Sequence, residues 1–481
     1  MTNDSALFTD YYSLTMAQGF WKMGMNRRAV FEMFFRAHPF GGGFSIFAGL
    51  QTLLERLKTF NFSEDDIYYL KSLKVFEEAF LDYLKDFRFT GTLWAMKEGS
   101  VIFPNEPLIR VSGGLLECQL IEGMLLNTIN FQSLIATKTA RVSLAADRAS
   151  VVEFGLRRAQ GPDGALSASR AAYIGGAAGT SNVLAGKKFG IPVLGTMAHS
   201  WVMAWPGEEE AFRAYAELYP DKTIFLIDTY DTLKSGILNA IKAGKTLAEK
   251  GKSFGIRLDS GDIHYLSVET RKMLDAAGLK KASISVSNDL DESIIKTLVD
   301  AGAPVDAWGV GTQMVTGGTE AAFPGVYKLT ASEDESGNFI PRMKFSDNPS
   351  KTTNPGVKQV WRLMDNGGMF IADVLSLEDP NESDLLEMGK TYPFWHPQAD
   401  YRRFYHTMEN AGLLLEECFA SGKITRENPD LKSIQNYVKL QLSSIDQSYK
   451  RLLNPHIYKV SITTKLRALK LELIKNFLGE L

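Results

Sequence analysis

The segment Ile256-Arg257-Leu258-Asp259-Ser260-Gly261-Asp262 joins a short apolar run to a polar end that contains glycine. Four more segments repeat this pattern, at residues 193–199, 224–228, 284–288 and 307–312. Their polar ends follow one another at intervals of roughly 23 to 31 residues, about the length of one strand plus a crossover helix. The repetition predicts βα units and therefore a parallel β-sheet.

The sequence between these runs has the spacing of amphipathic helices. Helices are predicted over residues 208–218, 232–243, 266–277 and 292–301, and Gly278 and Gly302 end the last two. Residues 151–154 add a strand before the five, followed by a helix over 182–188. Six or more such strands favour an irregular parallel α/β barrel over an open sheet. In such barrels the chemistry lies at the carboxyl ends of the strands.

The sequence before the repeats has a different character. Ser63-Glu64-Asp65-Asp66 predicts a capping box that starts a helix running to Phe80, and a second helix is predicted over 49–57. Short apolar runs between residues 91 and 114 predict a small sheet. We therefore expect an N-terminal α+β domain over 1–115 and the barrel over 116–343.

The remaining residues, 344–481, are predicted to form a C-terminal loop and helical region that packs on the other two domains. Residues 347–356 have the composition of a loop, and residues 359–364 have the pattern of a strand. Helical spacing is found at residues 403–419, 436–453 and 462–477.

Composition excludes several classes of protein. The 481 residues include 53 Lys and Arg and 56 Asp and Glu, so the net charge of −3 gives no general attraction for nucleic acid or anionic lipid. The only cysteines, Cys118 and Cys418, exclude a disulfide framework and a four-cysteine zinc site. Few cysteines and no disulfide framework predict a reducing, cytoplasmic compartment.

Membrane association is not expected. Residues 189–207 carry no charged side chain and are numerous enough for a membrane helix, but Gly190, Pro192, Gly195 and Pro206 would interrupt it. The first residues lack a basic stretch followed by an apolar one, so no signal peptide is expected.

The predicted strand ends combine groups that bind anions and sugars. Alternation along a strand sends Arg257 and Asp259 to one face, where a cation and a carboxylate suit a phosphorylated sugar; a structural ion pair is the alternative. Gly309, Gly311 and Thr312 can present backbone N–H groups to a phosphate, although glycines at strand ends also serve as turns.

Three further positions have two interpretations each. His199, one of only six histidines, ends an apolar run and is either a catalyst or a hydrogen-bonded core residue. Asp228 either holds ribose or Mg²⁺ through water, or caps the helix that starts at Thr232. Arg157, next to Arg158, lies either at the mouth of the site or in a surface ion pair.

Other catalytic constellations lack their parts. The sequence contains no Gly-x-x-x-x-Gly-Lys-Ser/Thr, no His-Glu-x-x-His and no Gly-x-Ser-x-Gly motif, which argues against P-loop, zincin and serine-hydrolase chemistry. The residues themselves therefore predict a barrel enzyme that acts on a phosphorylated sugar, with the type of reaction left open.

Six short segments, in their order and spacing, resemble nicotinate phosphoribosyltransferase over nearly the whole chain. They are residues 9–12 with Met16, 34–36 with 39–42, 153–164, 195–200, 257–262 and 355–358. The resemblance implies ATP-assisted transfer of the phosphoribosyl group from 5-phosphoribosyl 1-pyrophosphate to nicotinate, in NAD salvage. Its products would be nicotinate mononucleotide and pyrophosphate, together with ADP and phosphate.

The resemblance also implies roles for residues. His199 would be phosphorylated transiently by ATP, and Phe154 and Arg257 would enclose the pyridine ring. Asp228 would act indirectly or through Mg²⁺, the implied cofactor, although no resident metal site is predicted. The phosphoribosyl part would be bound by Arg157, Asp259, Gly309 and Gly311. Tyr12 would enter the neighbouring subunit's site in a head-to-tail homodimer, with a core tyrosine as the alternative.

Related activities remain as alternatives. In the nicotinamide-using branch an aspartate stands where this chain has Ser181, and aspartate would repel the nicotinate carboxylate, whereas a serine hydroxyl can donate to it. Quinolinate-using relatives are shorter and more basic. A catalytically silent ligand-binding relative would not need His199, Arg257 and Asp259 together, and an unrelated sugar-phosphate isomerase would leave the resemblance unexplained.

Overall fold

The computed structural model describes residues 5–346, 348, 351–378, 386–399, 401–426 and 429–479. It divides into two compact units, Met1–Leu134 with Ala322–Leu481, and Ile135–Ala321. This differs from the three predicted domains, because strands from the two ends of the chain share one sheet in the first unit. The predicted loop over 347–356 lies partly outside the described residues.

The second unit is built on a six-stranded parallel sheet with the order β7-β6-β11-β10-β9-β8. Its strands are β6 (Ser150–Glu153), β7 (Gly179–Thr180), β8 (Ile224–Leu226), β9 (Gly255–Leu258), β10 (Ser283–Asn288) and β11 (Ala307–Val310). The predicted parallel sheet is confirmed. Within residues 135–321, all of which are described, no ladder joins β7 to β8, so closure into a barrel stays a prediction.

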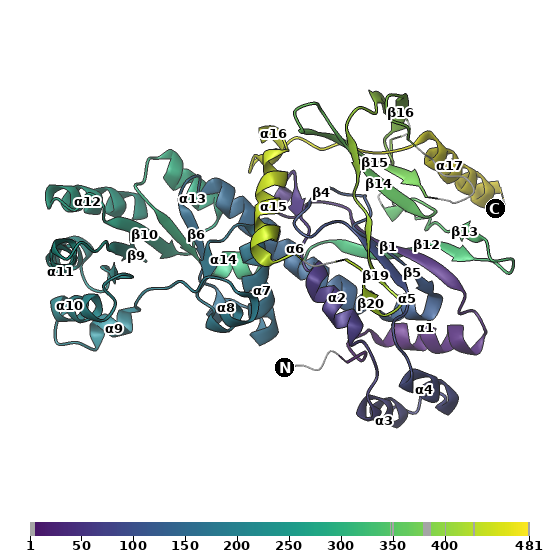
Figure 1. Ribbon diagram of the computed structural model, residues 1–481, viewed down its shortest axis with the longest axis horizontal. Coiled ribbons are helices and arrows are strands. Elements are labelled where there is room, and N and C mark those ends of the chain that lie inside the picture. The colour runs from purple at the N-terminus through teal and green to yellow at the C-terminus, as the bar shows by residue number, and fades with distance from the viewer. Residues whose placement is uncertain are drawn as a thin grey trace. The chain divides into compact units, whose positions relative to one another are not determined.

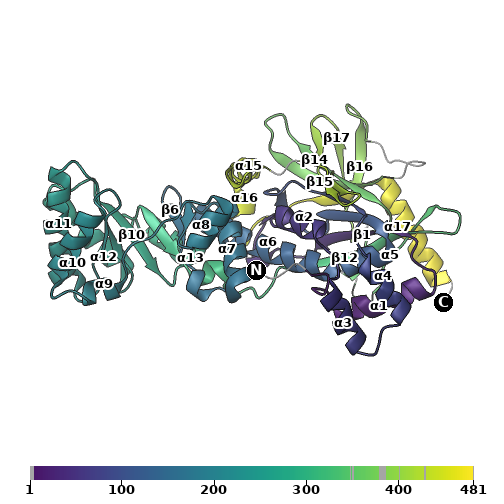
Figure 2. The ribbon, with the colours of Figure 1, turned by 60° about the horizontal axis from the view of Figure 1, so that its bottom comes forward.

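Helices connect these strands, and those predicted over 182–188, 208–218, 232–243, 266–277 and 292–301 are among them. They are η2 (Leu156–Arg158), α7 (Gly161–Gly175), α8 (Val183–Phe189), α9 (His199–Met203), α10 (Glu208–Leu218), η3 (Thr232–Gly236), α11 (Ile237–Glu249), α12 (Ile263–Ala276), α13 (Glu292–Asp300) and α14 (Thr312–Val315). Figures 1 and 2 show α10, α11 and α12 grouped at one end of this unit, beside β9 and β10.

One local prediction in this unit was wrong, and one predicted helix differs in its first turn. Residues 193–199 are not a full strand: only Val193 pairs, with Thr180, and His199 already begins α9. The helix predicted from Thr232 starts with a π-helical turn, η3, before α11. Gly236 ends this turn so close to strand β8 that a Cβ atom would lie 1.8 Å from the Ile227 carbonyl oxygen.

The first unit contains a seven-stranded sheet with the order β13-β12-β1-β5-β3-β19-β20. Its strands are β1 (Arg28–Phe35), β3 (Thr92–Ala95), β5 (Ile109–Gly114), β12 (Gly325–Glu333), β13 (Phe339–Pro341), β19 (Glu416–Ala420) and β20 (Lys423–Ile424). Strands β2 (Ser45–Ile46) and β4 (Val101–Ile102) pair separately. The sheet predicted between residues 91 and 114 is therefore split between two sheets.

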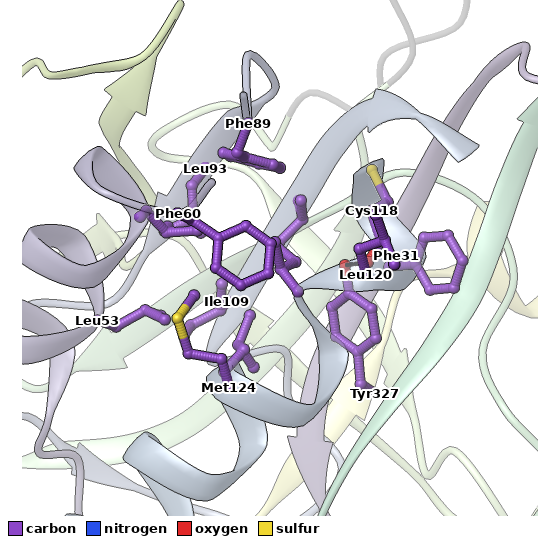
Figure 3. Packing of buried hydrophobic residues seen from close by; sticks show 14 of the residues in the cluster. Phe31, Leu53, Phe60, Phe89, Leu93, Ile109, Cys118, Leu120, Met124 and Tyr327 are labelled. Carbon is purple, nitrogen blue, oxygen red and sulfur yellow. Dashed lines mark hydrogen bonds between the residues drawn. The ribbon is translucent and has the colours of Figure 1, made fainter. Parts of the chain in front are cut away.

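A large apolar core fills the first unit (Figure 3). The rings of Phe31 and Tyr327 stack at a centroid distance of 4.8 Å, and the Tyr327 hydroxyl donates to the Cys118 carbonyl at 3.1 Å. The helices of this part are α1 (Tyr11–Lys22), η1 (Pro39–Gly41), α2 (Leu50–Lys58), α3 (Glu64–Ser72), α4 (Glu78–Lys85), α5 (Leu115–Leu120) and the first half of α6 (Glu122–Ala145), whose residues from Ile135 on belong to the second unit.

The predicted helix from Ser63 to Phe80 is two helices. The capping box is confirmed, because Ser63 Oγ accepts from the Asp66 N–H and the Asp66 carboxylate accepts from the Ser63 N–H. However, α3 ends at Ser72, and Lys74 has the left-handed φ of 55°, which breaks the helix before α4.

The C-terminal region is richer in strands than predicted. A six-stranded sheet, β17-β16-β21-β15-β14-β18, includes β14 (Lys358–Met364), β15 (Phe370–Leu377), β16 (Thr391–Trp395), β17 (Arg403–Thr407), β18 (Ala411–Leu413) and β21 (Val460–Ile462). The helix predicted over 403–419 is wrong, because this segment forms β17, β18 and β19. Cross-strand packing of Phe404 on Phe394 favours the strand over its helical spacing.

The other helices of this region agree with the prediction in kind. They are α15 (Leu431–Ser443), α16 (Gln447–Lys450) and α17 (Thr464–Gly479). Among the residues described, no helix is both long enough and apolar enough to span a lipid bilayer.

Candidate active site

The candidate site lies along one edge of the parallel sheet in the second unit. The strands are in register there: Arg257 pairs with Ser285, Ser287 with Gly309, and Val310 with Glu153. Because parallel strands end on the same side, the residues that follow β6, β8, β9, β10 and β11 come together. The structure thus brings the predicted strand ends into one site.

His199 begins α9 and points between two of these strand ends. Its Nδ1 atom is 3.2 Å from Thr229 Oγ1, and its Nε2 atom is 3.6 Å from Asp259 Oδ2. The side chain is 39% exposed, so the alternative of a buried core histidine is wrong. The ring is held on both sides and remains open to a ligand.

Asp259 follows β9 and is kept ionised by its neighbours. Ser287 Oγ donates to its Oδ1 atom, and Arg257 Nη2 lies 3.8 Å from the same oxygen. Partial burial acts to raise the pKa of the Asp259 carboxyl, but the Ser287 hydrogen bond and the charges of Arg257 and His199 outweigh it. The pKa therefore lies below its usual value.

Arg257 is held by more than the predicted ion pair. Its Nη1 atom donates to Thr196 Oγ1, and to the Met197 carbonyl at 3.2 Å, while its Nε is buried without a hydrogen-bond partner among the described residues. Burial lowers the pKa of the Arg257 guanidinium, although the carboxylates of Asp259 and Asp228 oppose this. A planar cation with an unused donor suits an anionic, aromatic ligand.

Asp228 connects two strand ends. Its Oδ2 atom accepts from the Asp259 N–H at 3.0 Å and from Ser260 Oγ at 2.5 Å, while its Oδ1 atom is buried without a hydrogen-bond partner among the described residues. The cap of the following helical turn is Asp231, so the helix-cap interpretation of Asp228 is wrong. An unused buried carboxylate oxygen fits a cation or a sugar hydroxyl.

The ring of Phe154 packs directly over Gly309. A Cβ atom on Gly309 would lie 2.5 Å from Phe154 Cδ2 and 2.6 Å from Cε2, so only glycine leaves room for this ring. Gly309 belongs to β11, and neither a turn nor a phosphate contact is needed to explain it. Gly311 and Thr312 follow at the start of α14.

Three family models match this chain. The nicotinate phosphoribosyltransferase (NAPRTase) family model covers residues 149–317, and the models of its N-terminal and C-terminal domains cover residues 7–130 and 357–470. The Bacillus subtilis (strain 168) nicotinate phosphoribosyltransferase is 42% identical over 460 residues, covering 95% of this chain and 93% of the relative. This chain belongs to the nicotinate phosphoribosyltransferase family. The family predicted from the sequence is confirmed.

The human members of the nicotinate phosphoribosyltransferase family give the same result. The human nicotinate phosphoribosyltransferase is 35% identical and covers 96% of this chain and 95% of its own length. The crystal structure of human nicotinic acid phosphoribosyltransferase superposes with a TM-score of 0.85 at 33% identity, covering 97% of this chain and 99% of that chain.

Ser181 and Arg157 have side chains without a hydrogen-bond or ion-pair partner among the described residues. Ser181 follows β7, its N–H donates to the Glu153 carbonyl at 2.9 Å, and its hydroxyl has no hydrogen-bond partner among the described residues. Arg157 lies in η2, is exposed, and has no ion-pair partner in the part of the chain described, so the interpretation as a surface ion pair is wrong. Its positive charge adds to the lowering of the Arg257 pKa.

Tyr12, from the first of the family segments, belongs to α1 of the first unit. Its side chain is 46% exposed, so the core-tyrosine alternative is wrong. Partial burial raises the pKa of the Tyr12 hydroxyl, and the nearby Glu122 carboxylate adds to this.

Four polar residues of the site were missed by the sequence analysis. Thr196 orients Arg257, and Thr229 orients His199. Ser260 and Ser287 hold the carboxylates of Asp228 and Asp259 in turn. Each lies next to a predicted strand end, so its general position could be predicted from the sequence. Its partner could not, because the pairing between strands decides which carboxylate or cation each hydroxyl contacts.

Proposed function

We propose that this chain transfers a phosphoribosyl group from phosphoribosyl pyrophosphate to nicotinate and couples the transfer to ATP hydrolysis. The observation that carries the proposal is the position of His199, held between Thr229 and Asp259 at the strand ends that also carry Arg257. The family match supports the phosphoribosyl transfer to nicotinate. The His199 imidazole, which is partly exposed and held by its neighbours, supports the coupling to ATP hydrolysis.

The first step is phosphorylation of His199. An unprotonated ring nitrogen attacks the γ-phosphorus of ATP, an N–P bond forms, and the P–O bond to the β-phosphate breaks to release ADP. Asp259 and Thr229 orient the ring and stabilise the charge that it gains. Water later attacks the phosphohistidine and releases phosphate.

The carboxylates of Asp228 and Asp259 would hold Mg²⁺ together with pyrophosphate oxygens. Mg²⁺ prefers oxygen ligands and is usually bound through one or two carboxylates together with substrate phosphates. The Oδ1 atom of Asp228, which has no hydrogen-bond partner among the described residues, would supply one ligand. When bound, Mg²⁺ would neutralise charge on the leaving pyrophosphate.

The second step forms the glycosidic bond. The pyridine nitrogen of nicotinate attacks the anomeric carbon of the ribose, and the C–O bond to pyrophosphate breaks. Positive charge develops on the ribose, and the Asp259 carboxylate stabilises it. The nucleophilic nitrogen carries no proton, so no general base is needed. Phe154 stacks on the pyridine ring, and Arg257 covers its other face.

The remaining residues bind the charged groups of the substrates. Arg157, Gly311 and Thr312 contact the phosphates of phosphoribosyl pyrophosphate, since Arg157 has no protein partner to give up among the described residues. The free hydroxyl of Ser181 donates to the nicotinate carboxylate, which favours nicotinate over nicotinamide.

The proposal extends to the assembly and the fold. The exposed Tyr12 supports a head-to-tail homodimer in which it enters the partner's site. We also propose that the parallel sheet closes as an irregular barrel, as the repeated βα units favour. Both cysteines are unpaired and buried, which supports a reducing, cytoplasmic compartment.

The test is phosphorylation of the protein by ATP labelled at the γ-phosphate. We expect acid-labile label on the wild type and none on His199→Asn, with ADP formation lost as well. The matched control is His264→Asn, because His264 is a half-buried histidine of α12 whose Nε2 atom lies 3.0 Å from the Ala301 carbonyl oxygen, away from the site. Equal labelling of His199→Asn and the wild type would refute the coupling.

A further inference from the structure

Glu153 is a fully buried carboxylate that joins three segments of the second unit. It ends β6 with a side chain that is 0% exposed. Its oxygens accept from the Gly155 N–H, from Ser169 Oγ of α7 at 2.9 Å, and from Thr180 Oγ1 of β7 at 2.5 Å. Three donors compensate for burying the charge, which would otherwise be costly.

The same network continues into the loop after β7. The Thr180 hydroxyl accepts from the Asn182 N–H at 2.9 Å, and Ser169 Oγ accepts from Asn182 Nδ2 at 3.3 Å. Asn182 Oδ1 in turn caps α8 by accepting from the Ala185 N–H at 3.2 Å. The loop is therefore fixed on both sides of Ser181.

Two residues of the proposed nicotinate site adjoin this network. Phe154 lies between Glu153 and Gly155, and Ser181 lies between Thr180 and Asn182. The main chain adds a link, because the Ser181 N–H donates to the Glu153 carbonyl at 2.9 Å. One carboxylate thus anchors both the stacking ring and the serine hydroxyl.

We propose that Glu153 is a positioning residue that sets selectivity for nicotinate over nicotinamide. The inference rests on the proposed function, in which Phe154 stacks on the pyridine ring and Ser181 meets its carboxylate. Glu153 fixes the spacing of these two groups without touching substrate, since its side chain is buried. A change of well under 1 Å in this spacing weakens a hydrogen bond to the carboxylate more than it weakens stacking.

The test removes one donor of the network without changing the volume of its side chain. Thr180→Val loses the hydroxyl, and Thr180→Ser keeps it. For Thr180→Val we expect the KM for nicotinate to rise about tenfold, the effect of losing one charge-assisted hydrogen bond, and the preference over nicotinamide to narrow accordingly. Labelling of His199 by ATP should stay at the wild-type level, and Thr180→Ser should retain wild-type selectivity.

The matched control is Thr223→Val. Thr223 is a buried threonine of the same unit, and its hydroxyl donates to the Tyr219 carbonyl at 2.7 Å. It lies just before β8, at the ends of the strands opposite to the candidate site. Thr223→Val should lose about as much thermal stability as Thr180→Val and keep the wild-type KM for nicotinate. Ser169→Ala, which removes another donor to Glu153, should repeat the selectivity change if Thr180→Val does not fold.

Three results would overturn the inference. They are an unchanged nicotinate preference in Thr180→Val and Ser169→Ala, the same change in Thr223→Val, and a fall in kcat for both pyridine substrates with both KM values unchanged. These results count against the inference only when the wild type forms nicotinate mononucleotide. If the wild type makes no nicotinate mononucleotide, the proposed function itself fails, and the two failures are thereby distinguished.

Discussion

The ring of Phe154 occupies the space that a side chain on Gly309 would need, with a Cβ atom there only 2.5 Å from Phe154 Cδ2. Gly309→Ala should therefore displace the ring from its position over β11. We expect the KM for nicotinate to rise by about tenfold, the loss of one aromatic stacking contact. Steady-state kinetics with nicotinate as the varied substrate provide the measurement.

Gly164→Ala is the control for this substitution. Gly164 lies in α7 of the same unit, and a Cβ atom there would meet nothing within 4 Å. Its kinetics should remain those of the wild type. A Gly309→Ala enzyme with unchanged KM for nicotinate would show that the ring of Phe154 does not bind the substrate.

Ser287 controls the pH range in which Asp259 is ionised. Its hydrogen bond helps to hold the pKa of the Asp259 carboxyl below the usual value, against the effect of burial. In Ser287→Ala that pKa rises, so protonation begins at a higher pH. The acidic limb of the pH profile of kcat/KM should move to higher pH, while Ser287→Thr should keep the wild-type limb. If the acidic limb does not move in Ser287→Ala, the ionisation of Asp259 is not what determines it.

Gly236 positions the loop that carries Asp228 and Thr229. A Cβ atom there would lie 1.8 Å from the Ile227 carbonyl oxygen, so Gly236→Ala must push η3 away from β8. The Thr229 contact to His199 would move with it. We expect kcat/KM to fall about 100-fold, which a displacement of about 1 Å at a reacting group can cause.

The control for Gly236→Ala lies in α11, which follows η3 directly. Gly244→Ala would place a Cβ atom 2.2 Å from the Phe254 ring, a clash of similar severity that involves no residue of the site. Overpacking of this kind costs roughly 1–3 kcal/mol of stability. Gly244→Ala should therefore melt lower and keep its kcat/KM. Parallel losses of activity in the two variants would argue against the positioning role.

Glu106 gives the first unit a pH-dependent stability. Burial, and then the charge of Asp373, raise the pKa of the Glu106 carboxyl well above its usual value. Arg362 pairs with Asp373 at 2.6 Å, and its positive charge acts to lower the Glu106 pKa, but burial and Asp373 outweigh it. Because only the folded state holds this proton, the free energy of unfolding falls as pH rises from the unfolded pKa toward the folded one.

The substitution that tests this is Glu106→Gln, which stays neutral at every pH. The wild type should lose up to ~1.4 kcal/mol of stability per pH unit from this group above the ordinary pKa of glutamate. The variant should lack that contribution, so its urea midpoint should depend less on pH. Parallel pH dependences of the two midpoints would show that Glu106 does not carry the proton.

The repeating units of the sheet were predictable because a polar or glycine-containing segment marks the end of each strand in the sequence. Helix α10 was predicted with the bounds that it has, and β9 and β10 fall within about a residue of their predicted runs. The segment 403–419 was not predictable in this way. Its spacing fits a helix, and only the strands that it pairs with, which lie far away in sequence, decide for a sheet.

The charged residues of the site were predictable from strand alternation, as the shared face of Arg257 and Asp259 shows. The network around Glu153 was not, because Ser169 and Thr180 are ordinary helix and strand residues until the fold places them against one carboxylate. The role of Gly309 beneath Phe154 was missed for the same reason. Close approaches between neighbouring strands leave no signal in a single sequence.

The most direct test of the central claim is product formation by the wild type from phosphoribosyl pyrophosphate and Mg²⁺. Nicotinate or nicotinamide is supplied, each with and without ATP, and the mononucleotide and ADP are followed by chromatography. We expect nicotinate mononucleotide whose formation is stimulated by ATP and accompanied by ADP. Product from nicotinamide alone, or nicotinate mononucleotide at a rate that ATP does not change and without ADP, would contradict it.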